Sequence, residues 1–419
     1  MCIRDRTNIM QTNIATWVQN AWIDYVAGRS SAMDPAKRPV STALISRPGE
    51  SKSNQVEGPL LKRLEDKLLE GEPTNPNLGD GGVMIDIPDS LVGTHIHWSP
   101  RGLVACISEN TNTRDAPDVR GFMVPKKDGT SAYTMPDMVV LERRLYEAGA
   151  KIVVLFLDEF LGTNHLTMKA LTDVFLNGRF GNFSLRATTW VIGASNRAQD
   201  GAGVNRALSI LTNRMNFMPV FLPIESWVAY ARSNLDMPGL MMAFAQQFPG
   251  KVTVDVPPRE GAFASYRSYT FAGEWMSAYK RAIGDNDPMT LPMDEYARGK
   301  IAGFVGEGLM TELAAHSKVA NELTPIKEVI RDPMGAKLPP AGRLDAAYAM
   351  AQSCVHYARP ENAEPLWTYV TRLPKELQVM AAVDMLRSDR TGGMLQNSPG
   401  LNDWVAKNGA LIRATQGVL

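Results

Sequence analysis

The chain has 419 residues, with 44 Lys and Arg against 44 Asp and Glu, and 3 Cys. This length allows about two or three domains with large buried cores. The zero net charge argues against broad neutralisation of nucleic-acid phosphates, so we expect no nucleic-acid partner. No apolar run is long enough to span a bilayer, and the cysteines show no metal-ligand or disulfide spacing; we therefore expect a cytoplasmic protein without membrane association.

Residues 1–35 are predicted to hold a short leading segment followed by one helix. The opening letters MCIRDR have neither the apolar core nor the cleavage site of a targeting signal. We interpret them as a translated adaptor sequence, so that the native start lies at Met10 or is missing. From 11 to 28, apolar residues recur at helical spacing, among them Trp17, Ala21 and Tyr25.

Residues 36–222 alternate predicted strands with predicted helices. Strands are expected at 39–45, 83–87, 103–108, 152–157 and 188–194, and helices at 55–70, 138–148 and 166–176, with a loop at 71–82. Pro59 would interrupt the first of these helices. Short strands on either side of Asp128-Gly129 predict a β-hairpin, because this dipeptide favours a positive-φ turn. The alternation indicates a parallel sheet covered by helices on both faces.

The chain changes character after Pro223. The remaining pattern is mostly helical and is broken by Pro- and Gly-rich joints near 250–262, 285–293 and 332–342. We predict a helical lid at 223–285 and a separate helical C-terminal region at 286–419.

A candidate phosphate-binding loop lies between the strand at 39–45 and the helix after it. The segment reads Ser46-Arg47-Pro48-Gly49-Glu50-Ser51-Lys52-Ser53. The amine of Lys52 suits the β- and γ-phosphates of a nucleotide, and the hydroxyl of Ser53 suits Mg²⁺. The N-terminus of the helix adds partial positive charge. Nucleotide contacts are expected at Pro48, Gly49, Glu50, Ser51, Lys52, Ser53 and Asn54.

Three residues of this loop depart from the usual pattern. Ser46 and Ser51 stand where a phosphate-binding loop commonly has Gly, and a β-carbon there would crowd the backbone against phosphate. Glu50 places a carboxylate near the phosphates, which is unfavourable unless it points to solvent or to Arg47. The alternative interpretation is an ordinary Pro-Gly turn followed by a solvated lysine.

Polar residues end two of the predicted strands. Asp158 and Glu159 follow the buried strand at 152–157, and Asn196 follows the strand at 188–194. Ligands bind at the carboxyl edge of open α/β sheets, where Asp158 would hold Mg²⁺ and Glu159 would act as general base. The amide of Asn196 can hydrogen-bond both phosphate and water. Taken alone, the acidic pair is equally compatible with a solvated turn after a core strand, and a turn residue is the simpler interpretation of Asn196.

Two arginines complete the candidate site. Arg214 ends the short segment Leu208–Arg214, and Arg267 lies in Ser265-Tyr266-Arg267-Ser268. The guanidinium of an arginine is always charged and forks onto phosphate oxygens, so Arg214 suits a transition-state contact supplied by a neighbouring subunit. Arg267, in the helical lid, would sense the γ-phosphate. A surface arginine at a helix end is the simpler alternative for both.

The order of these features resembles that of the AAA+ ATPases, and within them the MoxR-like branch. The resemblance rests on five features in sequence: a phosphate loop, an Asp-Glu strand end, an Asn strand end, an Arg at a helix end and an Arg in a helical lid. It extends over roughly residues 36–410. The segments that resemble the branch are Asp118–Gly121, Gly193–Arg197, Asp200–Arg206, Phe263–Tyr269 and Arg372–Gln378.

This resemblance implies an AAA+ fold, that is, a P-loop core with a parallel sheet flanked by helices, followed by a helical lid and a helical C-terminal extension. It implies Mg-ATP bound between subunits of a homo-hexameric ring, and a von Willebrand factor A-type partner protein. ATP hydrolysis would then drive remodelling or activation of partner proteins. Glu159, Asn196, Arg214 and Arg267 would act in catalysis, with Ser53 and Asp158 on the metal.

Two alternative functions remain open from the sequence. Ser46 and Ser51 favour a degenerate scaffold that keeps the fold without hydrolysing ATP. Lys126 and Lys127 in the predicted hairpin would suit a DNA-linked AAA+ motor that hides basic loops in its pore. The hairpin itself would either transmit motion to a partner or be a passive surface ribbon.

Overall fold

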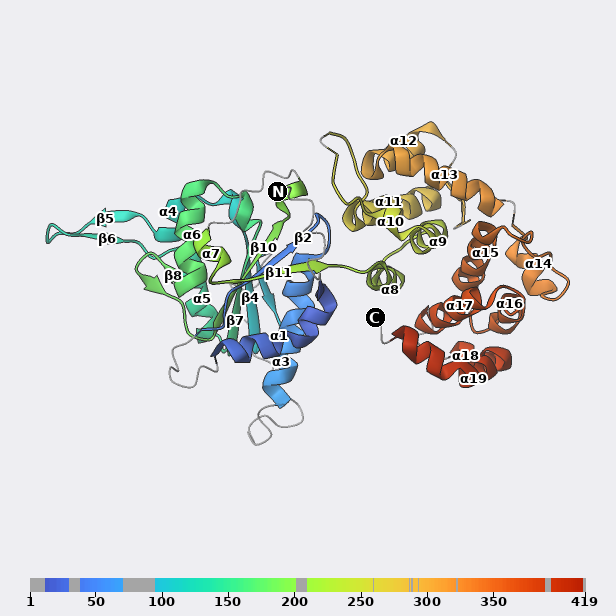
Figure 1. Ribbon diagram of the computed structural model, residues 1–419, viewed down its shortest axis with the longest axis horizontal. Helices are drawn as coiled ribbons and strands as arrows, with labels where there is room; N and C mark the ends of the chain where they lie inside the picture. The colour runs from blue at the N-terminus through green and yellow to red at the C-terminus, as the bar shows by residue number, and fades with distance from the viewer. Residues whose placement is uncertain are drawn as a thin grey trace, which may run out of the picture. The chain divides into compact units, whose positions relative to one another are not determined.

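The computed structural model describes residues 12–29, 38–70, 95–200, 209–258, 260–285, 287, 289–292, 294–321, 323–388 and 393–416. The chain divides into two compact units, Met1–Leu222 and Pro223–Leu419 (Figure 1). The opening MCIRDR, the predicted loop at 71–82, the predicted strand at 83–87 and most of the segment Asp200–Arg206 lie outside the described residues.

Unit 1 is built on a sheet of 7 strands in the order β1-β11-β2-β10-β7-β4-β3. Neighbouring strands run parallel, except that β3 is antiparallel to β4. The strand bounds are β1 Thr12–Asn13, β2 Thr42–Ser46, β3 Ile96–Trp98, β4 Val104–Asn110, β7 Ile152–Asp158, β10 Thr189–Asn196 and β11 Asn216–Phe221. The strand β7 is buried until Asp158, as expected for a central parallel strand.

Helices cover both faces of this sheet. On one face Trp190 of β10 packs against Trp17 and Tyr25, with ring centroids 6.2 and 5.9 Å away. On the other face the next residue, Val191, joins a core that includes Val139 and Leu171. The helices of unit 1 are α1 Ile14–Arg29, α2 Lys52–Gln55, α3 Leu61–Glu70, α4 Ala116–Arg120, α5 Asp137–Glu147, α6 His165–Asn177 and α7 Ser209–Thr212. The predicted architecture of a parallel sheet flanked by helices is confirmed.

The helix after the candidate loop is not interrupted at Pro59, contrary to the prediction. A π-helical turn, η2 Val56–Leu60, contains Pro59 and joins α2 to α3. The wider turn accommodates the proline ring and its missing N–H without ending the helix. Lys52 therefore begins a helical run that continues to Glu70.

The hairpin predicted around Asp128-Gly129 is confirmed. Strands β5 Met123–Pro125 and β6 Ser131–Tyr133 pair antiparallel and extend away from the sheet (Figure 1). Gly129 has φ 79°, a conformation that favours glycine. The base of the hairpin exposes Phe122, Met123 and Val124. A second short pair is formed by β8 Arg179–Phe180 and β9 Phe183–Ser184.

Unit 2 is helical, as predicted. Its helices are α8 Ile224–Asn234, α9 Gly239–Gln247, α10 Pro249–Val252, α11 Tyr266–Ala282, α12 Glu295–Val305, α13 Glu307–Asn321, α14 Ile326–Arg331, α15 Leu344–Tyr357, α16 Ala363–Val370, α17 Lys375–Ser388, α18 Gly393–Asn397 and α19 Pro399–Gln416. Among the described residues, no helix is both long and apolar enough to cross a membrane. The proposed division near residue 285 into lid and C-terminal region stays a prediction.

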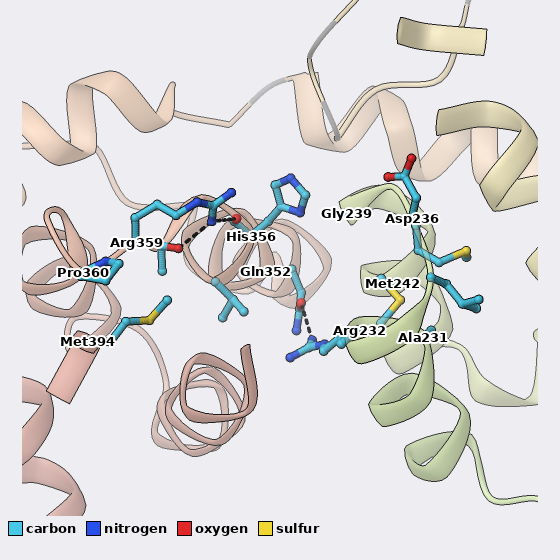
Figure 2. Close-up of a pocket in the computed structure, with 14 residues that line it drawn as sticks. Ala231, Arg232, Asp236, Gly239, Met242, Gln352, His356, Arg359, Pro360 and Met394 are labelled. Carbon is cyan, nitrogen blue, oxygen red and sulfur yellow. Dashed lines mark hydrogen bonds between the residues drawn. The ribbon is translucent and has the colours of Figure 1, made fainter. Parts of the chain in front are cut away.

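Four helices of unit 2 are joined by what we call the helix-bridging network, made of Arg232, Gln246, Gln352 and Asp384. Arg232 lies 2.5 Å from the carboxylate of Asp384 and donates to Gln352 Oε1 at 2.9 Å. The Arg232–Gln352 bond is visible in Figure 2. Both glutamine amides donate to Asp384 Oδ2, at 3.2 Å from Gln246 and 3.3 Å from Gln352. The network borders a cavity of about 500 Å³ that is also lined by His356, Arg359 and Met394 (Figure 2).

Candidate nucleotide site

The polar strand ends predicted from the sequence meet at one edge of the sheet. Ser46 at the end of β2 is in register with Asn196 at the end of β10. Asp158 ends β7, which lies beside β10 and pairs with β4 on its other side. After β2 the chain forms β3 at the edge of the sheet, returns through β4, β7 and β10, and then reaches β11 on the far side of β2. Ligands of open α/β folds bind at such a reversal of strand order.

The loop between β2 and α2 contains two residues with positive φ. Gly49 has φ 78°, and Ser51 has φ 56° and ψ 24°, which is the left-handed helical conformation. Ser51 thus adopts the backbone geometry for which glycine is usual at this position. Among the described residues, Ser51 and Glu159 are the non-glycine residues with positive φ. Such strained backbone commonly occurs at functional sites.

Lys52 connects the ends of β2 and β10. Its amine donates to Ser46 Oγ at 2.8 Å, to Asn196 Oδ1 at 3.3 Å and to Arg47 O at 3.5 Å. Both Ser46 and Lys52 are buried, with 2% and 8% of their surface exposed. We call Ser46, Lys52, Ser53, Asp158 and Asn196 the strand-end cluster.

Ser53 and Asp158 form the other half of the strand-end cluster. The hydroxyl of Ser53 donates to Asp158 Oδ2 at 2.7 Å, and the other carboxylate oxygen accepts from the backbone of Glu159 at 2.9 Å. The buried hydroxyl of Thr111 donates to the carbonyl of Asp158 at 2.8 Å. These contacts fix the strand end and leave a hydroxyl and a carboxylate side by side.

Glu159 is held by a residue that the sequence reasoning missed. Asn112 Nδ2 donates to Glu159 Oε2 at 2.6 Å. Asn112 lies in the 3₁₀ turn η4 Thr111–Thr113, directly after β4. A β-carbon at Gly162 would lie 2.7 Å from Asn112 Oδ1, so glycine is required there for Asn112 to take this position. The signal in the sequence is the polar run Asn110–Thr113 after a buried strand, the same pattern that singled out Asp158 and Asn196.

Glu50 points to Arg47, one of the two favourable arrangements that the sequence analysis named. Arg47 Nε donates to Glu50 Oε1 at 2.6 Å. Burial raises the pKa of the Glu50 carboxyl, and the charge of Arg47 opposes this shift. The second oxygen, Oε2, is buried without a hydrogen-bond partner in the described part of the chain. Of the other loop candidates, Pro48 is half-buried and Asn54 is exposed on α2.

The structure does not bring Arg214 to the strand-end cluster. Arg214 is exposed and precedes β11, whose first residue, Asn216, pairs with Thr42 at the start of β2. Lys52 follows the opposite end of β2, and a strand of five residues spans roughly 16 Å. Arg214 therefore lies near the amino edge of the sheet, where it lines a cavity of about 310 Å³ with Ser41.

Arg267 belongs to unit 2. It is exposed in the first turn of α11, and Ser265 caps this helix by accepting from the backbone of Ser268 at 3.2 Å. The guanidinium thus stands in solvent at a well-formed helix start, and its predicted contact with the γ-phosphate stays a prediction.

The donor set of the strand-end cluster fits a magnesium nucleotide. Mg²⁺ is usually bound by one or two carboxylates together with water and substrate phosphates. Asp158 and Ser53 supply one carboxylate and one hydroxyl, and Lys52 supplies the adjacent cation. No group of three or more His, Cys, Asp or Glu residues within the described ranges could hold a metal ion by itself.

No protein-family model matches the chain, and no curated protein is similar to it in sequence. Among solved structures it is similar to the ORC2 protein of Aeropyrum pernix in its ADP form, with 13% identity, a TM-score of 0.37 and coverage of 83% of this chain and 82% of that chain. It is also similar to NtrX from Brucella abortus in complex with ADP, with 13% identity, a TM-score of 0.32 and coverage of 96% and 69%. A chain of the HORMA:CdnC:Trip13 complex of E. coli MS115-1 shows 12% identity and a TM-score of 0.32, with coverage of 74% and 85%. Because these TM-scores are low, we base the function on the site geometry.

Proposed function

We propose that the chain is a MoxR-like AAA+ ATPase that couples hydrolysis of Mg-ATP in an oligomeric ring to the remodelling or activation of partner proteins. The observation that supports this proposal most directly is the meeting of Lys52, Ser53, Asp158 and Asn196 at one sheet edge. Lys52 and Ser53 open α2 directly after the loop that follows β2, and Asp158 and Asn196 end two other strands. Lone solvated turn residues have no reason to converge in this way.

The nucleotide and metal would be held by the groups of this edge. Lys52 would pair with oxygens of the β- and γ-phosphates, and Ser53 and Asp158 would hold Mg²⁺, directly or through water. Backbone N–H groups of the loop Pro48–Lys52 and the start of the helical run would add favourable partial charge. When bound, ATP supplies the phosphoanhydride bond that is broken.

Glu159 and Asn196 would act on the attacking water. The carboxylate of Glu159 accepts a proton from that water, and Asn196 orients it by a neutral hydrogen bond. In the present structure Asn112 holds the carboxylate of Glu159 at 2.6 Å. Asn112 is therefore a positioning residue, because it fixes the base without touching phosphate itself.

The proposal is tested first by nucleotide binding. Mg-ATP titrated calorimetrically into the full chain is expected to bind, and Lys52→Ala is expected to abolish binding because it removes the buried cation. Lys62→Ala is the matched control, since Lys62 is an exposed lysine further along the same helical run. Equal affinity of the parent protein and Lys52→Ala would exclude the strand-end cluster as a nucleotide site. Binding without phosphate release would instead indicate the non-hydrolysing scaffold.

The ring is supported by the position of Arg214. An arginine at the amino edge of the sheet cannot serve its own carboxyl-edge site, but it can complete the site of a neighbouring copy. Glu159→Gln and Arg214→Ala should each be inactive. When equal amounts of the two variants assemble together, roughly a quarter of the interfaces should combine an intact Glu159 with an intact Arg214. The mixed ring should therefore regain ATP hydrolysis at those interfaces. A mixture that stays inactive, with both variants folded, would argue against a shared site.

The hairpin β5–β6 is the candidate contact with a client or with the expected von Willebrand factor A-type partner. It extends from unit 1 and exposes Phe122, Met123 and Val124 at its base, with Lys126 and Lys127 near its turn. Exposed apolar side chains on a protruding ribbon suit protein contacts. Phe122→Ser with Met123→Ser should uncouple partner stimulation from basal ATP hydrolysis, measured by phosphate release with and without the partner.

A further inference from the structure

The most informative departure from the usual phosphate loop is Ser46. Its side chain stands at the end of β2, opposite Asn196 in register, and only 2% of the residue is exposed. The sequence alone suggests that a β-carbon here would crowd the backbone. In the structure the hydroxyl instead contacts the amine of Lys52 at 2.8 Å.

The orientation of the Ser46 hydroxyl is determined by its two contacts. It donates its proton to Arg47 O at 2.9 Å, so its lone pairs are free to accept from Lys52. The bond between them is a buried hydrogen bond to a charged group, which is stronger than one between neutral groups. When Lys52 moves away, Ser46 keeps its bond to Arg47 O, and no buried hydroxyl proton is left without a partner.

The amine of Lys52 has three N–H donors, and its contacts include three protein oxygens of the loop and the strand ends. These are Ser46 Oγ, Asn196 Oδ1 and Arg47 O, at 2.8, 3.3 and 3.5 Å. Because Lys52 is only 8% exposed, water contributes little to its solvation. A phosphate oxygen must therefore displace one of these protein acceptors before Lys52 can pair with it.

We propose that Ser46 is an intramolecular competitor of the nucleotide phosphates: in the empty site it holds Lys52 against the ends of β2 and β10 and thereby lowers nucleotide affinity. This inference rests on the proposed nucleotide site and adds to it the residue that sets its affinity. A glycine at this position would remove the shortest of these three contacts. Ser46 is thus a positioning residue for Lys52, distinct from the groups that would touch the nucleotide.

The test compares Ser46→Ala and Ser46→Gly with the parent protein, by calorimetric titration of the full chain with Mg²⁺ and the non-hydrolysable ATP analogue in which the β–γ bridging oxygen is NH. Both variants should bind roughly tenfold more tightly, because the empty state loses a charge-assisted hydrogen bond that the bound state has already given up. The KM for ATP should fall by the same factor. Ser41→Ala is the matched control: it removes a buried serine hydroxyl next to the other end of β2, where Ser41 donates to Phe175 O at 2.6 Å. Its affinity should equal that of the parent.

The outcomes separate the competitor from the proposed function. Competition is supported if both Ser46 variants bind the ATP analogue more tightly than the parent while the affinity of Ser41→Ala equals that of the parent. It is also supported if binding is measurable only in the two Ser46 variants. If the parent binds and the Ser46 variants bind equally or more weakly, the competitor is overturned while the nucleotide site stands. If neither the parent nor any variant binds, the nucleotide site itself is refuted, and the competitor with it. Thermal unfolding of each variant shows whether weaker binding comes from a damaged fold.

Discussion

The strand-end cluster of unit 1 and the helix-bridging network of unit 2 are both groups of polar side chains at buried positions, but their members are paired differently. In the network, Arg232, Gln246, Gln352 and Asp384 come from four different helices, and each contacts members on other helices. In the strand-end cluster the members come from strand ends and from the first turn of α2, and they contact one another at the edge of the sheet. Both groups contain half-buried members, namely Ser53, Asp158 and Asn196 in the cluster and Arg232 and Gln246 in the network.

This difference distinguishes polar contacts that stabilise the folded helices from polar contacts that a bound ligand can replace. Removal of one charged partner from the network would leave the other charge buried among helices without its counterion. The contacts of the network therefore stabilise the packing of the helices. The strand-end cluster lies at a sheet edge beside strained backbone at Ser51 and Glu159. Its hydrogen bonds are those that phosphate, metal and water would take over. We therefore expect substitutions in the cluster to change chemistry and substitutions in the network to change stability.

The largest expected effect is that of Glu159→Gln on catalysis. Loss of the general base should lower phosphate release roughly 10²- to 10⁴-fold, while Mg-ATP still binds. The measurement is steady-state phosphate release together with calorimetric binding, and the melting temperature should stay close to that of the parent. Unchanged release would remove Glu159 from this role and would weaken the distinction drawn between the two polar groups.

Asp384→Ala should instead destabilise unit 2. Arg232 would keep its charge, with 10% of its side chain exposed, and would lose its carboxylate partner. Removal of one member of a buried ion pair costs about 3–5 kcal/mol, which chemical denaturation would detect. The double variant Arg232→Met with Asp384→Leu should lose much less of its free energy of unfolding, because it leaves no unpaired charge. A double variant that is as unstable as Asp384→Ala would show that the network does more than neutralise Arg232.

Asn112→Ala should produce an intermediate effect on turnover. Loss of the hydrogen bond to Glu159 should lower phosphate release roughly tenfold, since a bond to a charged group is worth about 1.5 kcal/mol or more. Gly162→Ala should act similarly, because its new methyl group would displace Asn112. The double variant should release phosphate no more slowly than either single variant. Additive losses would mean that Gly162 acts independently of Asn112.

The smallest effect concerns Glu50 and depends on pH. Burial raises the pKa of this carboxyl above its usual 4.5, so the folded protein binds this proton more tightly than the unfolded chain does. Its contribution to stability is present below pH 4.5 and is lost as the pH rises through the raised pKa. Glutamine does not titrate, so the stability of Glu50→Gln relative to the parent should increase as the pH rises through that range. Thermal unfolding of both proteins from about pH 4 to 8 measures the difference, and a constant difference would contradict the burial effect.

The sequence by itself determined the local elements and the residue types of the site. The apolar runs of β7 and β10 indicate buried strands because they are of strand length and contain β-branched residues, whereas a buried helix would need a longer run. Asp128-Gly129 specifies its turn locally. Since the carboxyl ends of parallel strands share one edge, the proximity of Lys52, Asp158 and Asn196 also follows from the pattern.

Only the tertiary structure decided which side chains touch and which weak elements form. The strand β11 is short and contains Pro219, and it becomes a strand because β2 offers a parallel partner far away in the sequence. The contact of Asn112 with Glu159, the hydroxyl of Ser46 on Lys52, and the position of Arg214 at the opposite sheet edge have the same origin. Periodicity and turn chemistry report burial and local backbone preference, whereas these contacts depend on strand order, register and rotamers that are fixed only when distant segments pack together.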